Sequence, residues 1–227
     1  MEKGLYIVAT PIGNLEDMSY RAVRTLKEVD LIACEDTRHS RILLNHYEIK
    51  TPYTSFHSYT SDAKLSALAL DLKNGKSIAV ITDAGTPGIS DPAWSLIKAA
   101  AQEGVKIIPI PGAAAFLTAL MGAGLPLNDF TYLGFVPAKK GRQSFFELVK
   151  SDPKTVVFYE SPHRLLKTLE QMNEIIGPLR ACVLARELTK LHESFYRGTV
   201  ADILALVKRS PIKGEMVLLV GPEDFKF

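Results

Sequence analysis

Short, almost uninterrupted apolar runs recur along the first half of the chain. Each run is followed by a polar segment and then by a stretch in which apolar residues return at helical spacing. The predicted strands cover residues 5–9, 30–34, 53–56, 77–82 and 105–110, and the predicted helices cover 19–29, 38–46, 61–74, 93–103 and 113–123. Apolar strands that alternate with helices are typical of a mostly parallel sheet covered by helices on both faces.

The pattern changes at the segment GLPLND (residues 124–129), which predicts a domain boundary. Beyond it, the predicted strands cover residues 132–136, 155–159, 181–186, 193–197 and 215–220. One predicted helix ends at residue 150. Two more cover residues 162–176, with Ser161 as N-cap, and residues 200–209. We therefore predict two α/β domains: residues 1–123 with a mostly parallel sheet, and residues 124–227 with a mixed sheet.

Composition narrows the class of protein without naming a function. The chain has 227 residues, is 47% hydrophobic and carries a formal net charge of +2, so it can bury a large core and shows no strong electrostatic preference for a partner. Cys34 and Cys182 lie in apolar stretches and are predicted to be buried free thiols, and neither they nor the histidines have the spacing of a metal site. The N-terminus has no signal-peptide pattern, and the longest apolar run is too short to cross a bilayer. We expect a soluble cytoplasmic protein without a metal.

Four loops rich in glycine, proline and polar residues follow predicted strands of the first domain. They are TPIGN (residues 10–14), EDTR (35–38), TDAGTPGISDP (82–92) and PGAA (111–114). Ligands of open α/β sheets bind outside the carboxyl ends of the strands, where glycine lets the backbone come close. The four loops therefore indicate a small-molecule site, in which Asp83 could accept hydrogen bonds from hydroxyl or amino groups. Neither a GxGxxG fingerprint nor a P-loop is present.

Ionisable residues gather at strand ends of the second domain. The segments are YESPHR (residues 159–164), ARELTKLHE (185–193) and KGE (213–215). Such a density of opposite charges suits acid–base chemistry or contact with a phosphodiester, and it is also what a surface network of ion pairs would look like. Ser161 lacks the sequence of a nucleophile elbow, which argues against serine hydrolysis.

Taken together, six segments resemble one known family in content and order. They are ATPIGNL (residues 9–15), CEDTR (34–38), TDAGTPGISDP (82–92), YESPHR (159–164), ARELTK (185–190) and KGE (213–215). The chain resembles the ribosomal small subunit methyltransferase I group of the tetrapyrrole (corrin/porphyrin) methylases. This resemblance implies a homodimer with S-adenosylmethionine held in a cleft between the two domains. It also implies 2′-O-methylation of a cytidine ribose in the decoding region of 16S rRNA, on the 30S subunit.

The resemblance also implies which residues contact the cofactor. They are Pro11, Asp83, Ala84, Gly85, Thr86, Ile89, Ala114, Ala115, Glu160 and Leu188, with Gly214 and Glu215 near the rim. The family usually carries serine where this chain has Ala114. A hydroxyl contact to the cofactor is thereby lost at that position, although backbone groups of the turn remain.

The charged segments of the second domain supply the candidates for catalysis and RNA contact. A ribose hydroxyl must lose its proton at or before attack, and Glu187 or Lys190 could take it, the lysine only if its pKa is lowered. Arg186, with Arg164, could hold adjacent phosphates. The predicted RNA-contacting residues are Lys139, Lys140, Arg142 and Arg164. The alternative for Arg186, Glu187 and Lys190 is a purely structural role between domains or subunits.

Two other functions fit the same sequence. One is a C-methyltransferase for a tetrapyrrole or other small acceptor, since one scaffold can serve several substrates. The other is a protein without catalytic activity, either a sensor of a nucleotide-like ligand or a ribosome-binding assembly factor. The strings ATPIGNL, CEDTR and ARELTK favour the rRNA branch by resemblance.

Overall fold

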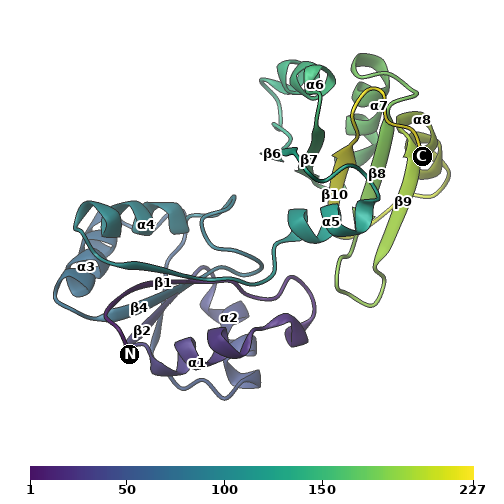
Figure 1. Cartoon of the computed structure of the whole chain (residues 1–227). Coiled ribbons are helices and arrows are strands. Elements are labelled where there is room, and N and C mark those ends of the chain that lie inside the picture. Colours follow the sequence, from purple (N-terminus) through teal and green to yellow (C-terminus); the bar gives the residue numbers. More distant parts are fainter. The chain divides into compact units, whose positions relative to one another are not determined.

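The computed structural model describes all 227 residues and divides into two compact units, Met1–Ala114 and Ala115–Phe227 (Figure 1). The expected boundary lay after Ala123, and helix α5 (Ala115–Ala123) accounts for the difference. This helix packs against strands of the second sheet. Thr118 is the only polar residue of its sequence, so α5 offers no extended polar face that would assign it to one sheet.

The first unit contains a five-stranded parallel sheet, as the alternation of strands and helices predicted. The strands are β1 (Gly4–Val8), β2 (Leu31–Cys34), β3 (Tyr53–Ser55), β4 (Ser77–Ile81) and β5 (Ile107–Ile110), in the order β3-β2-β4-β1-β5. The helices are α1 (Tyr20–Glu28), α2 (Thr37–His46), α3 (Asp62–Lys73) and α4 (Ala93–Gln102), with a short 3-10 turn η1 (Leu15–Asp17).

Helices cover both faces of this sheet (Figure 1). Leu26 of α1 and Leu44 of α2 pack on one face, and Leu68 of α3 and Leu96 of α4 pack on the other. Both faces of β1 are therefore buried, which explains its unbroken apolar sequence. The two free cysteines of the chain are buried, as predicted.

The order of the strands creates a topological switch between β1 and β4. These two strands are neighbours, and the chain leaves β1 through α1 toward β2 but leaves β4 through α4 toward β5, on the opposite face. Loops at such a switch point separate at the carboxyl edge and leave room for a ligand. The loops in question are the ones that contain Pro11 and TDAGTPGISDP.

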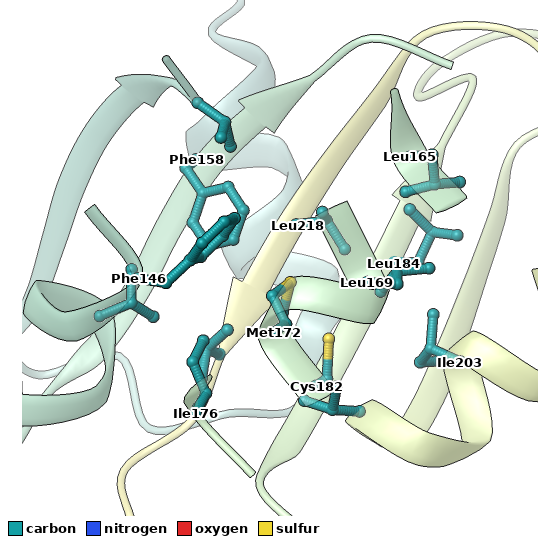
Figure 2. Close-up of a cluster of buried hydrophobic side chains, with 14 of the residues drawn as sticks. Phe146, Phe158, Leu165, Leu169, Met172, Ile176, Cys182, Leu184, Ile203 and Leu218 are labelled. Atoms are coloured by element: carbon teal, nitrogen blue, oxygen red, sulfur yellow. The ribbon is translucent and has the colours of Figure 1, made fainter. Parts of the chain in front are cut away.

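The second unit contains a mixed sheet, also as predicted. The strands are β6 (Phe130–Phe135), β7 (Thr155–Glu160), β8 (Ala181–Arg186), β9 (Ser194–Thr199) and β10 (Met216–Val220), in the order β6-β7-β10-β8-β9. Only β6 and β7 run parallel. Helices α6 (Arg142–Ser151), α7 (Leu165–Ile175) and α8 (Val200–Arg209) pack on one face. Figure 2 shows the core between them, with Phe146, Phe158 and Met172 among its members.

Helix α7 begins later than the sequence predicted, at Leu165 instead of residue 162. Ser161 is not its N-cap. The backbone N–H of Ser161 donates to the Glu160 carboxylate, and the N–H of Arg164 donates to the Ser161 carbonyl to close a turn. Residues 161–164 are thus used by a polar turn, and the helix starts after it. No helix of the structure combines the length and the apolar character that crossing a bilayer requires.

Candidate functional site

The four loops of the first unit lie at one edge of the parallel sheet and are joined by hydrogen bonds. Thr10 and Gly85 exchange backbone hydrogen bonds of 2.9 and 3.1 Å, which connect the loop after β1 to the loop after β4. The Thr10 hydroxyl donates to the Thr82 carbonyl at 3.0 Å, and the Thr86 hydroxyl donates to the Ala113 carbonyl at 3.0 Å. Gly85 has a φ of 88°, a conformation that favours glycine. The loops therefore form one connected surface of backbone and hydroxyl groups.

Carboxylates concentrate at the ends of β2 and β4. Glu35 accepts hydrogen bonds from the Thr82 hydroxyl at 2.5 Å and from the Asp83 backbone at 3.3 Å, while Asp83 accepts one from the Asp36 backbone at 3.1 Å. Burial raises the pKa of Asp83, and the neighbouring charge of Glu35 raises it further, although the hydrogen bond from Asp36 opposes the shift. A cationic group of a ligand would relieve this repulsion, so the edge suits a small molecule with positive charge.

The rest of TDAGTPGISDP is held by its own aspartate. Asp91 accepts hydrogen bonds from the backbone of Gly88, at 2.8 and 2.9 Å, and from the backbone of Ala93 at the start of α4. Gly88 and Ser90 have φ values of 89° and 65°. The loop is therefore fixed by internal bonds, and Ile89 at its tip stays partly exposed.

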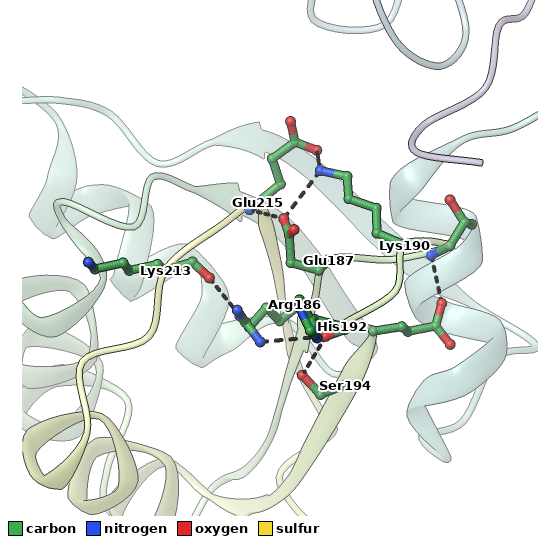
Figure 3. Close-up of polar contacts among 9 residues, drawn as sticks. Arg186, Glu187, Lys190, His192, Ser194, Lys213 and Glu215 are labelled. Carbon is green, nitrogen blue, oxygen red and sulfur yellow. Dashed lines mark hydrogen bonds and ion pairs between the residues drawn. The ribbon is translucent and has the colours of Figure 1, made fainter. Parts of the chain in front are cut away.

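Two of the three charged segments of the second unit meet where β8 ends and β10 begins (Figure 3). The Glu187 carboxylate accepts a hydrogen bond from the Glu215 backbone at 2.8 Å and pairs with the Lys190 ammonium at 3.2 Å. Lys190 also pairs with the Glu215 carboxylate at 3.0 Å. Arg186 donates to the Lys213 carbonyl at 2.6 Å and to the His192 carbonyl at 3.5 Å. The structure thus brings together residues from the predicted ARELTK and KGE segments.

The pKa shifts in this cluster run against the roles expected of a base. The backbone hydrogen bond from Glu215 and the contact with Lys190 lower the pKa of Glu187 despite partial burial. Burial tends to lower the pKa of Lys190, but its bonds to Glu215 and Glu187 outweigh that effect and raise it. Lys190 therefore stays protonated at neutral pH, whereas a basic lysine would need a lowered pKa.

The backbone of the cluster is held in unusual conformations. Glu187 and Thr189 have φ values of 50° and 64°, which residues other than glycine rarely adopt. Gly214 has a φ of 100°, and a Cβ there would lie 2.5 Å from the Glu187 carboxylate. Strain of this kind gathers at functional sites, where the surrounding structure maintains it. Leu188, between the two strained residues, is buried.

Glu160 is not part of either exposed surface. Its side chain is fully buried, and its carboxylate pairs with Arg164 at 2.6 Å and Arg142 at 3.6 Å. It also accepts hydrogen bonds from the Thr168 hydroxyl and the Ser161 backbone. The Glu160 carboxylate is therefore enclosed by groups of its own chain, and the contribution of Glu160 to cofactor binding stays a prediction.

Arg142 is also enclosed by groups of its own chain. It is 6% exposed, and its guanidinium donates to Gln171, to the Thr168 hydroxyl and to the Pro137 carbonyl. The contact of Arg142 with RNA stays a prediction, and these bonds do not favour it. Arg164 is partly exposed, yet it is bonded to Glu160 and to the Val136 carbonyl.

The remaining predicted site residues differ in their exposure to solvent. Pro11 and Ala84 are at least partly exposed in the edge loops, Ala114 is buried behind them, and Ala115 opens α5 in the second unit. Lys139 and Lys140 are exposed.

Two residues that organise the first site, Thr10 and Glu35, were not among the predicted site residues. Each lies in one of the loops that the sequence singles out. A threonine or glutamate at the end of a buried strand, opposite a second polar loop, is the signal that could have identified them.

Comparison with known proteins gives one consistent assignment. Residues 4–204 match the family model of the Tetrapyrrole (Corrin/Porphyrin) Methylases. The chain is 48% identical to "Ribosomal RNA small subunit methyltransferase I" of Halalkalibacterium halodurans, over 96% of this chain and 76% of that protein. It is 46% identical to the protein of the same name from Escherichia coli O157:H7, over 95% of this chain and 77% of that protein.

Solved structures share the fold at low sequence identity. The methyltransferase CobJ aligns with a TM-score of 0.72 and 19% identity, covering 97% of this chain and 95% of that one. A uroporphyrin-III C-methyl transferase from Thermus thermophilus, complexed with S-adenyl homocysteine, aligns with a TM-score of 0.68 and 14% identity, covering 96% of this chain and 97% of that one. At these identities the likeness concerns the fold alone.

Proposed function

The chain belongs to the tetrapyrrole methylase family and, within it, to the ribosomal RNA small subunit methyltransferase I group, and we propose that it methylates 16S rRNA with S-adenosylmethionine as donor. The proposed acceptor is the 2′-oxygen of a cytidine ribose in the decoding region, within the 30S subunit. The observation that carries the proposal is the 45–48% identity to relatives of that name over nearly the whole chain. The tetrapyrrole alternative is supported by the general family model and by structures that share the fold at low identity.

The residues of the first unit fit S-adenosylmethionine chemically. Its adenosine part needs donors and acceptors at close range, which the backbone of Pro11 and of the Asp83–Ile89 loop can offer. Its positive sulfonium and ammonium groups suit an edge with the carboxylates of Glu35 and Asp83. When bound, the cofactor supplies an electrophilic methyl group on sulfur. The residues of the chain therefore need only position and deprotonate the acceptor.

The charged cluster of the second unit is proposed to act on the acceptor. Lys190, kept protonated by Glu187 and Glu215, stabilises negative charge on the ribose oxygen or an adjacent phosphate. Glu187 is ionised at neutral pH and is the remaining candidate acceptor for the hydroxyl proton, with its lowered pKa making it a weaker base than a free glutamate. Arg186 supplies a guanidinium suited to a phosphate. Gly214 keeps the Glu187 side chain close to β10.

Lys139 and Lys140 are proposed to contact the rRNA backbone. Both are exposed in the turn between β6 and α6, whereas Arg142 of the same segment is buried. We expect the double variant Lys139→Ala/Lys140→Ala to weaken rRNA binding and to reduce its dependence on salt, because fewer counterions are released. Filter binding at several salt concentrations measures both effects. An unchanged salt dependence would remove the two lysines from the interface.

The reaction itself is tested with labelled S-adenosylmethionine. The acceptors are assembled 30S particles and naked 16S rRNA, both from cells that lack this protein. Nuclease digestion and mass spectrometry then locate the label. Label on the 2′-oxygen of one cytidine supports the proposal and tells which form of substrate is recognised. Label on a base, or on neither RNA, contradicts it. We also propose that the protein is cytoplasmic and that it forms a homodimer. Sedimentation of the pure protein tests the oligomeric state.

A further inference from the structure

A bulge in β6 decides which face of the second sheet Phe135 occupies. Tyr132 pairs with Val157 and Phe135 pairs with Tyr159, so β6 has one residue more than β7 between these two pairs. Gly134, within this step, has a φ of 66°. Because side chains alternate along a strand, one inserted residue moves all later side chains to the opposite face. Phe135 therefore shares a face with Tyr132 and Tyr159, away from the core in which Leu133 packs.

The ring of Phe135 ends a row of aromatic side chains. Its centroid lies 5.1 Å from that of Tyr159, and Tyr159 lies 5.6 Å from Tyr132. Tyr132 in turn contacts Phe116 of α5 at 4.5 Å, and the Phe116 backbone donates to the Tyr159 hydroxyl at 3.2 Å. The inner rings of the row are partly or fully buried, but Phe135 is 56% exposed. Phe135 is therefore the exposed end of a row of aromatic rings that are otherwise partly or fully buried.

The chain that follows Phe135 is anchored from inside. Arg164 donates to the Val136 carbonyl at 3.2 Å, and the buried Arg142 donates to the Pro137 carbonyl at 2.9 Å. Both arginines are paired with Glu160. The exposed Lys139 and Lys140 come next. An exposed ring and two cations therefore lie on one short segment, and hydrogen bonds from two arginines hold its beginning.

We propose that Phe135 is a stacking platform for an unpaired base of the RNA substrate, while Lys139 and Lys140 hold the adjoining phosphates. The inference rests on the proposed function and adds the structural form of the substrate that is recognised. Aromatic side chains bind splayed-out bases of single-stranded RNA, and neighbouring cations follow the backbone. A flat, exposed ring that two exposed lysines follow closely in sequence fits such a nucleotide. The substrate would then present at least one unstacked base next to the modified segment.

The test compares variants of the full-length protein in rRNA binding and in steady-state methyl transfer. We expect Phe135→Ala and Phe135→Leu to weaken rRNA binding about tenfold, as loss of one stacked base does, and to raise the KM for rRNA with kcat nearly unchanged. Phe135→Trp should restore binding. The salt dependence of binding should stay at the wild-type value in all three, because stacking releases no counterions, unlike the lysine variant.

Phe227→Ala is the matched control, since Phe227 is also 56% exposed and also contacts one aromatic ring. It should bind rRNA like the wild type. Wild-type binding by Phe135→Ala and Phe135→Leu would overturn the stacking inference and leave the proposed function intact. Conversion of a wild-type dimer to monomers by Phe135→Ala would also overturn it, because the ring would then cover a second copy. Failure of the wild-type protein to bind or methylate 16S rRNA would overturn the proposed function and the inference with it.

Discussion

Replacing Lys190 with methionine is expected to slow methyl transfer to rRNA by about 100- to 1,000-fold, the effect of removing one preorganised charge from an active site. Methionine keeps much of the side-chain length but lacks the ammonium that pairs with Glu187 and Glu215. Lys190→Arg should retain more activity because it keeps the charge. Binding of S-adenosylmethionine, measured by calorimetry, should stay near the wild-type value in both variants.

The pH dependence separates this role from that of a base. The raised pKa of Lys190 keeps it protonated through the neutral range, so its ion pairs stabilise the folded loop there and are lost only as pH rises through that raised value. The lowered pKa of Glu187 means that its contribution is lost only as pH falls through that lowered value. Between these limits we expect no change in rate from either group. A rate that rises between about pH 7 and 9, and loses this rise in Lys190→Met, would instead identify Lys190 as the base.

Lys208→Met is the control for this experiment. Lys208 lies on α8 and pairs with Glu170 at 3.4 Å, so the variant also removes a lysine from an ion pair. It should methylate rRNA at the wild-type rate. Equal rates for Lys190→Met and Lys208→Met would show that the Lys190 cluster has only a structural role.

Replacing Glu160 with glutamine is expected to lower the free energy of unfolding of the second unit by about 3 kcal/mol, because two guanidinium groups lose their buried countercharge. The carboxylate is fully buried between Arg142 and Arg164, and the amide of glutamine matches its shape without its charge. Hydrogen exchange measures the effect: protection should fall in β7 and α7 and stay unchanged in the first unit.

Glu170→Gln is the matched control, since it removes an exposed carboxylate from the pair with Lys208. It should cost less than about 1 kcal/mol. The same pair of variants decides between two roles of Glu160. If Glu160 contacted the cofactor, Glu160→Gln would weaken S-adenosylmethionine binding and leave the stability of the second unit close to that of Glu170→Gln.

The candidate site was only partly readable from the sequence. The sequence places TDAGTPGISDP after β4 and the TPIGN loop after β1, and parallel strands alone bring those loops to one edge. It also places ARELTK and KGE at strand ends. It does not give the charge state of Lys190, because Glu215, which raises the pKa of that lysine, comes from another strand end. The burial of Glu160 likewise depends on Arg142 and Thr168, which only the packing of α6 and α7 brings to it.

The sequence by itself determined the two sheets, one parallel and one mixed, since the spacing of apolar runs and helices depends on local periodicity and on chain connectivity. Tertiary structure decided the position of an element or side chain where the local sequence pattern favours no position or favours another one. Helix α5 has no extended polar face, so only its contacts assign it to the second sheet. Phe135 lies on its face because pairing with β7 admits one extra residue at Gly134, and alternation along the sequence alone would place it on the opposite face. The charge state of a residue, its burial and the face on which it lies depend on neighbours that are distant in sequence, and the fold brings those neighbours together.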